Sequence, residues 1–78
     1  MKFCPELEEE ICEAMSSVTF FSAKITEAQS GYYISYVIYS TYTITNFITD
    51  ADMQKLLESI FSSRPDLKKL QIAHIINL

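Results

Sequence analysis

Glycine, proline and tryptophan are scarce in this chain of 78 residues, which has one glycine, two prolines and no tryptophan. A single glycine excludes a glycine-rich phosphate-binding loop. Histidine is as rare: His74 is the only one, and it lies among apolar neighbours, which favours a structural side chain over a catalytic base. Because no residue pattern suggests a catalytic site, we predict that the protein is not an enzyme and uses no cofactor.

The chain also has too few cysteines for a disulfide scaffold. If the segment between Cys4 and Cys12 is helical, the two lie about 12 Å apart along the helix axis, beyond the reach of a disulfide. A zinc site would need further ligands, and only His74 offers an imidazole. We therefore expect two reduced, small apolar side chains in an acidic neighbourhood that raises a thiol pKa, and no metal site.

Charge is missing between Glu27 and Asp50, a stretch that contains all five tyrosines. About 20 apolar residues suffice to cross a bilayer, but polar side chains interrupt this stretch throughout: Gln29, Ser30, Ser35, Ser40, Thr41, Thr43, Thr45, Asn46 and Thr49. The N-terminus has Lys2, Pro5 and several glutamates where a secretory signal would have its apolar core. We predict no membrane partner and an intracellular, cytoplasmic protein.

Two segments have the apolar periodicity of helices. Pro5 suits a first helical position, and the apolar stripe that follows predicts a helix over residues 5–17. Thr49 and Asp52 have the form of a capping box, and helical spacing then continues as far as Phe61, which predicts a second helix over residues 50–63. The two stripes consist of Leu7, Ile11, Ala14, Met15 and Val18, and of Met53, Leu56, Leu57, Ile60 and Phe61.

The C-terminal segment, residues 67–78, fits either a helix or a strand. Asp66 and the lysines that follow it suit a helical turn. A strand is favoured by the two-residue spacing of Leu70, Ile72, His74, Ile76 and Leu78, which are apolar apart from His74. We expect a short helical turn and then a strand at the edge of the sheet.

Three strands are predicted between the helices. Residues 18–28 are rich in β-branched and aromatic side chains, Gln29 to Gly31 supply a turn, and a second break is expected at Ser40 and Thr41. In the middle strand Tyr32, Ile34, Tyr36 and Ile38 share one face, and Tyr33, Ser35, Val37 and Tyr39 share the other. The expected fold is one α+β domain over residues 1–78, a three-stranded antiparallel meander in the order α-β-β-β-α with helices on one face.

The net charge of −4 is concentrated on the first helix. Acids and bases cancel after residue 17, whereas before it Lys2 stands alone against a group of glutamates. At 100° per residue, the face opposite Leu7 and Ile11 presents Glu6, Glu9, Glu10 and Glu13, with Glu8 at its flank. This acidic face is either an ordinary solvated surface or a site for a protein partner with a basic surface.

The tyrosine-rich run allows two readings as well. Its rings belong to the core and ordinary sheet surface, or to a protein-binding or homodimer face formed by Tyr33, Tyr36, Tyr39 and Tyr42. Aromatic platforms that bind single-stranded nucleic acid normally come with a basic groove, and this run has no basic residue. We therefore expect no direct binding to nucleic acid.

The element order and the acidic helix together are similar in outline to small phage- or virus-encoded inhibitors, including some anti-CRISPR proteins that present carboxylates to a nucleic-acid-binding surface. The resemblance covers element order and charge alone, and it implies an inhibitor of a larger partner that handles nucleic acid. Two hypotheses follow. The chain is a small acidic, non-catalytic protein-binding module, or it is a homo-oligomeric structural subunit that associates through its tyrosine-rich sheet.

Overall fold

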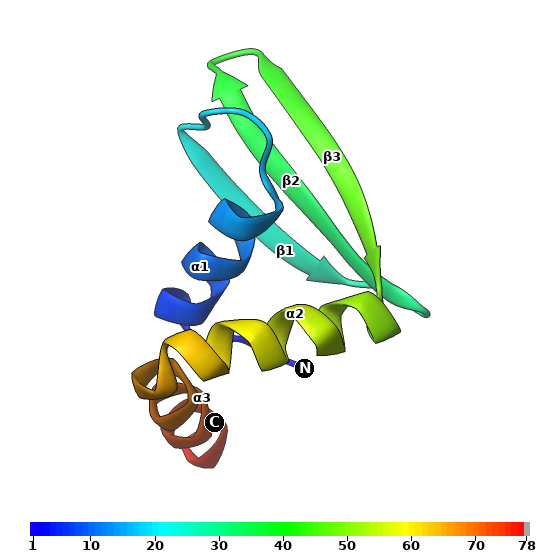
Figure 1. Cartoon of the computed structure of the whole chain (residues 1–78). Coiled ribbons are helices and arrows are strands. Elements are labelled where there is room, and N and C mark those ends of the chain that lie inside the picture. The colour runs from blue at the N-terminus through cyan, green and yellow to red at the C-terminus, as the bar shows by residue number, and fades with distance from the viewer. Residues whose placement is uncertain (78) are drawn as a thin grey trace.

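The computed structural model describes residues 1–77, and the chain over this range is α+β, as predicted (Figure 1). Its elements follow in the order α1 (Pro5–Met15), β1 (Ser22–Glu27), β2 (Gly31–Tyr39), β3 (Tyr42–Thr49), α2 (Asp50–Ser63) and α3 (Pro65–Ile76). The three strands form one antiparallel sheet in the order β1-β2-β3. The predicted meander and its turns, including the break at Ser40 and Thr41, are confirmed.

The first helix and the first strand are shorter than their sequence patterns. Helix α1 ends at Met15, because the Ser16 hydroxyl accepts a hydrogen bond from the Val18 N–H at 3.1 Å and so competes with the helical ladder. Strand β1 then begins at Ser22, although β-forming residues start at Val18. The segment between them, residues 16–21, is an irregular connection that lies beside α1.

The register of the strands separates the two faces of the sheet. Ile25 lies opposite Ile34, and on the other side of β2 the core-facing tyrosines Tyr32 and Tyr36 lie opposite Ile48 and Ile44. These side chains share the face on which α1 and α2 pack, whereas α3 packs mainly against those two helices (Figure 1). The hydrophobic core between the sheet and the helices consists of Cys4, Leu7, Ile11, Cys12, Tyr32, Ile34, Tyr36, Ile48, Met53, Ile60 and Leu67.

Tyr36 connects the sheet to α1 within this core. Its ring is 5.0 Å from that of Phe20, and its hydroxyl donates a hydrogen bond to the Cys12 carbonyl at 2.9 Å. Burial, and after it the neighbouring Cys12, raises the pKa of Tyr36 to about 12. The tyrosine therefore stays protonated and acts as a buried donor that fixes the end of α1.

The second helix is confirmed from Asp50 to Ser63. Thr49 is its N-cap residue, and its Oγ1 accepts a hydrogen bond from the Asp52 N–H at 3.2 Å. This is the first half of the predicted capping box. Because Thr49 also ends β3, the sheet passes into α2 without a loop.

The prediction of a C-terminal strand is wrong, because the segment from Pro65 to Ile76 is helix α3. Pro65 occupies the start of the helix, and the residues facing inward are Leu67, Gln71 and His74, a helical spacing. The alternating residues that suggested a strand lie largely exposed on this helix, with Ile76 74% exposed. Leu78, the last residue of the predicted strand, lies outside the described residues.

Gln71 is a polar residue on the buried side of α3, and both polar atoms of its side chain are hydrogen-bonded there. It is only 5% exposed, its side-chain oxygen accepts a hydrogen bond from the Cys4 N–H at 2.8 Å, and its side-chain nitrogen donates one to the Lys2 carbonyl at 2.7 Å. A buried amide with both partners in place is stable. It fastens the N-terminal segment to the C-terminal helix.

Candidate functional site

A groove of about 720 Å³ lies between α1 and the segment that leads into β1. One wall is the outer side of α1, and the other is formed by the connection and the first residues of β1. Its lining comprises Pro5, Glu8, Glu9, Cys12, Glu13 and Ser16 on the helical side, and Val18, Thr19, Phe20, Phe21, Ser22 and Ala23 on the other. The groove thus combines carboxylates with aromatic and aliphatic side chains.

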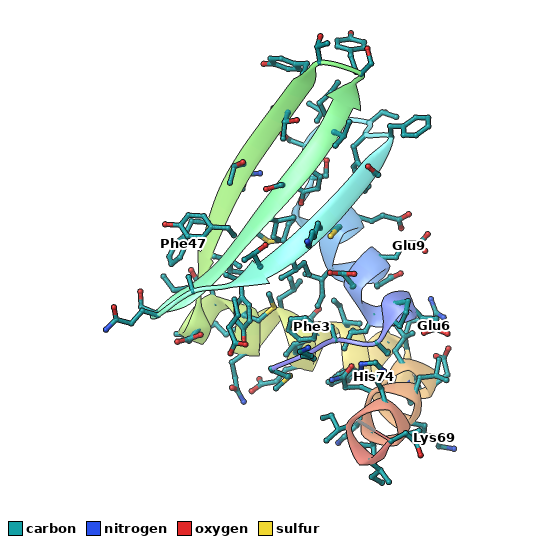
Figure 2. The ribbon with its side chains drawn as sticks, turned by 180° about the vertical axis from the view of Figure 1, so that it is seen from behind. Phe3, Glu6, Glu9, Phe47, Lys69 and His74 are labelled. Atoms are coloured by element: carbon teal, nitrogen blue, oxygen red, sulfur yellow. The ribbon has the colours of Figure 1, made fainter. Side chains whose placement is uncertain are left out.

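The acidic face predicted on α1 is divided by the fold. Glu9 and Glu13 are exposed and line the groove. Glu6 is exposed too, but it lies outside the lining, and Glu10 turns to Arg64, with 3.7 Å between Oε2 and the guanidinium. Figure 2 shows Glu6 and Glu9 projecting from α1 on the flank of the molecule opposite Phe47. Two of the four predicted carboxylates therefore belong to one concave site.

Glu8, expected at the flank of the acidic face, has a structural part in the groove. Its Oε2 accepts a hydrogen bond from the Ile25 N–H at 3.1 Å. The Ala28 N–H donates a hydrogen bond to the Gly31 carbonyl across the turn. Hydrogen-bonded and non-hydrogen-bonded pairs alternate along an antiparallel ladder, so Ile25 and Ile34 form a non-hydrogen-bonded pair and the Ile25 N–H points away from β2. Glu8 therefore closes part of the β1 edge and holds α1 against the sheet.

The apolar wall of the groove is exposed to solvent. Phe21 is 89% exposed and Val18 is exposed beside it, whereas Phe20 turns inward onto Tyr36. A second hollow of about 360 Å³ shares Phe21 and Ser22 with the groove. Its remaining lining is largely apolar and comes from the end of β2: Val37, Ile38, Tyr39 and Ser40. The two hollows thus adjoin at Phe21 and Ser22, the first with carboxylates in its lining and the second largely apolar.

Cys12 lies beneath this groove as a neutral group. Burial raises the pKa of its thiol to about 11, and the carboxylates of Glu8 and Glu13 add to the effect. A thiolate is therefore disfavoured, which is the reverse of what an activated cysteine nucleophile needs. Both cysteines are free and buried, as the sequence predicted.

Three of the four tyrosines assigned to a binding face are exposed, but they occupy two places. Tyr33 is on the face that the helices leave open, where its ring is 5.0 Å from that of Phe47. Tyr39 and Tyr42 form a second pair at the tip of the β2–β3 hairpin, with ring centroids 6.2 Å apart. The placement of Tyr36 on this face is wrong, because Tyr36 points into the core and is 1% exposed.

The outer side of α3 is a further exposed surface. It combines the isoleucines Ile72, Ile75 and Ile76 with the lysines Lys68 and Lys69. His74 is half-buried in the last turn of the helix (Figure 2).

No group of three or more His, Cys, Asp or Glu side chains is placed to share a metal ion among residues 1–77. Over the same range, no helix combines the length and apolar character needed to cross a membrane. The chain matches no family model, no curated protein and no solved structure.

Proposed function

We propose that this chain is a non-catalytic protein-binding module that holds a basic segment of a partner protein in the groove between α1 and β1. The observation that supports this most directly is the shared lining of that groove. The lining combines the exposed carboxylates of Glu9 and Glu13 on one wall with the exposed Phe21 ring and Val18 side chain on the other.

The charge of the groove selects a cationic occupant. Glu9 and Glu13 are four residues apart on one helix face, so their like charges repel one another in the free protein. A lysine or arginine between them relieves that repulsion and gains two favourable interactions. Complementary charge of this kind raises the association rate and the specificity more than the affinity.

The aromatic wall suits the same occupant. Lysine and arginine have long aliphatic stems that pack on apolar surface, and their cationic heads are attracted to the face of an aromatic ring. Phe21 offers such a ring beside the carboxylates. The second hollow beyond Phe21 accepts an apolar side chain. The preferred segment is therefore basic residues followed by a large apolar residue.

The dimensions of the groove suit an extended chain. The eleven residues of α1 span about 17 Å at 1.5 Å per residue, a length that about five residues in extended conformation cover. A basic segment of this length held in the groove is withheld from nucleic acid. The proposal therefore includes the inhibitor function implied by the resemblance to small phage- or virus-encoded inhibitors.

The experiment is a fluorescence anisotropy titration with a dye-labelled peptide of about eight residues, lysines and arginines followed by leucine and phenylalanine. The test variant is Glu9→Gln with Glu13→Gln. The matched control is Glu6→Gln with Glu58→Gln, which removes the same charge from exposed residues outside the groove. We expect the test variant to raise Kd about tenfold and the control to change it less than about twofold.

Two results would contradict the proposal. Equal loss in both double variants would mean that net charge alone attracts the peptide. Absence of binding by the wild-type protein at moderate salt would remove the groove as a site for basic segments. A peptide with glutamates in place of the basic residues serves as the negative probe.

A further inference from the structure

The two edges of the sheet differ in how far they are protected from pairing with another strand. At the β1 edge, α1 packs alongside the strand and Glu8 accepts the outward Ile25 N–H. Lys24 and Glu27 add charges within the strand itself. Such features prevent edge-to-edge association in natural sheets. The β1 edge is therefore protected by α1, by the Glu8 carboxylate and by charges of the strand itself.

The β3 edge has no comparable protection. The Asp50 N–H donates a hydrogen bond to the Ser30 carbonyl at 3.1 Å. Hydrogen-bonded and non-hydrogen-bonded residue pairs alternate along an antiparallel ladder, so this pair determines which residues of β3 bond to β2. The backbone groups of Thr43, Thr45 and Phe47 therefore point away from the sheet. Among residues 1–77, no side chain and no other segment forms a hydrogen bond with them.

The composition of β3 makes this edge suitable for pairing. Its sequence, YTITNFIT, contains no charge and no proline, and it is eight residues long. The ladder's irregularity lies between Val37 and Tyr39, near the hairpin tip, so it does not distort the free edge along most of β3. A regular, uncharged edge strand of this length is a template for another strand.

From this contrast we infer that a second copy of the chain pairs with β3, antiparallel and related by a two-fold axis at Thr45. Thr45 then lies opposite Thr45 of the second copy, and Phe47 lies opposite Thr43. Each outward pair exchanges two backbone hydrogen bonds. The two sheets join into one continuous sheet of six strands, with all helices on the same face.

The distribution of charge favours a second copy as the occupant. Strand β3 has no charge that could repel its own copy, and threonines directly opposite one another are a favourable cross-strand pair. The acidic helix α1 packs on β1, at the far edge of the sheet from β3 (Figure 1). In the dimer the two acidic helices are therefore kept apart at opposite ends.

This dimer is independent of the proposed groove, because the groove uses the β1 side of the sheet and the dimer uses the β3 edge. Each copy keeps its own groove. The dimer would thus present two binding sites, and a partner with two linked basic segments would bind it more tightly than a partner with one.

The test is the mass in solution, measured by light scattering after size exclusion over a dilution series. Thr45→Lys places like charges opposite one another at the two-fold axis, which raises the dimer dissociation constant about tenfold or more. The matched control is Thr26→Lys, an exposed threonine on the same open face but on β1. We expect dimers for the wild type and for Thr26→Lys, and monomers for Thr45→Lys at the same concentration.

Amide hydrogen exchange shows that the variant remains folded. In every variant the amides of Ile44, Asn46 and Ile48 stay protected, because they bond to β2. The amides of Thr43 and Phe47 are protected in the wild-type dimer and exchange fast in Thr45→Lys. A wild-type monomer at all concentrations, a dimer that survives Thr45→Lys, or a dimer lost equally in Thr26→Lys would each overturn the inference.

Discussion

The carboxylate of Glu8 accepts a hydrogen bond from the Ile25 N–H at 3.1 Å, so the acidic helix itself closes one edge of the sheet. This contact fixes the position of α1 beside β1 and thereby forms the groove between them. We expect Glu8→Ala to lower the free energy of unfolding by about 1–2 kcal/mol, since a hydrogen bond to a charged group is lost and a backbone donor is left unpaired. Urea unfolding measures the change.

Glu9→Ala is the control for this prediction. Glu9 is exposed and its side chain makes no hydrogen bond within residues 1–77, so truncating it should change stability by less than about 0.5 kcal/mol. If the two variants were equally stable, the Glu8 contact would have no part in holding α1.

Gln71 provides the second prediction. Gln71→Ala removes both hydrogen bonds that fasten Lys2 and Cys4 to α3, and it leaves the Cys4 N–H buried without a partner. We expect a loss of about 1–3 kcal/mol in the free energy of unfolding. Gln54→Ala, an exposed change on α2, should be close to neutral. A neutral Gln71→Ala would contradict the role given to this amide.

Gly31 is the position where the sheet tolerates no side chain. A Cβ there would collide with the Ile48 carbonyl oxygen and would lie 2.6 Å from Cζ of Phe47, whose ring covers the glycine on the open face. We expect Gly31→Ala to destabilise the protein by about 1–3 kcal/mol, because backbone and ring must both move. Ser30→Ala in the adjacent turn is the control, and thermal unfolding would show the difference.

Alkaline pH should destabilise the fold. The pKa of Cys12 is raised from 9.0 to about 11, and that of Tyr36 from 10.0 to about 12. The unfolded chain therefore loses these protons at lower pH than the folded chain does. Stability from this source is fully present below pH 9 and falls as pH rises through 11 and 12.

Cys12→Ala separates the contribution of the thiol. The variant should be less stable at neutral pH because a buried group is missing, but its stability should fall less steeply above pH 9. Chemical unfolding under reducing conditions at a series of pH values measures both slopes. Identical slopes would contradict the assignment to Cys12.

Much of the fold could be predicted from local patterns. The apolar spacing after Thr49 and its capping acid determine α2, and the uncharged run with a break at Ser40 determines β2 and β3. Helix α3 could not be predicted in the same way. Its apolar residues follow a two-residue alternation, and the decisive contact is between Gln71 and Cys4, which are far apart in sequence.

The candidate site was predictable only in part. Helical geometry placed Glu9 and Glu13 on a common face, and the structure keeps them together in the groove. The opposite wall cannot be found in this way, because Val18 and Phe21 have the side chains of a strand and their position beside α1 is set by tertiary packing. The signal available in the sequence was the pair Phe20–Phe21, two large rings next to a helix end. Glu10 was separated from the acidic face by Arg64, another distant contact.

The most direct test of the proposed groove is to map where the basic peptide binds. Protein labelled with nitrogen-15 is titrated with the peptide of lysines, arginines and a terminal leucine and phenylalanine, and amide chemical shifts are followed. We expect the shifts to concentrate at Glu9, Glu13, Val18 and Phe21, and the amides of α3 and β3 to remain unchanged. Shifts that centre on α3 or on the open face of the sheet, with the groove amides unmoved, would contradict it.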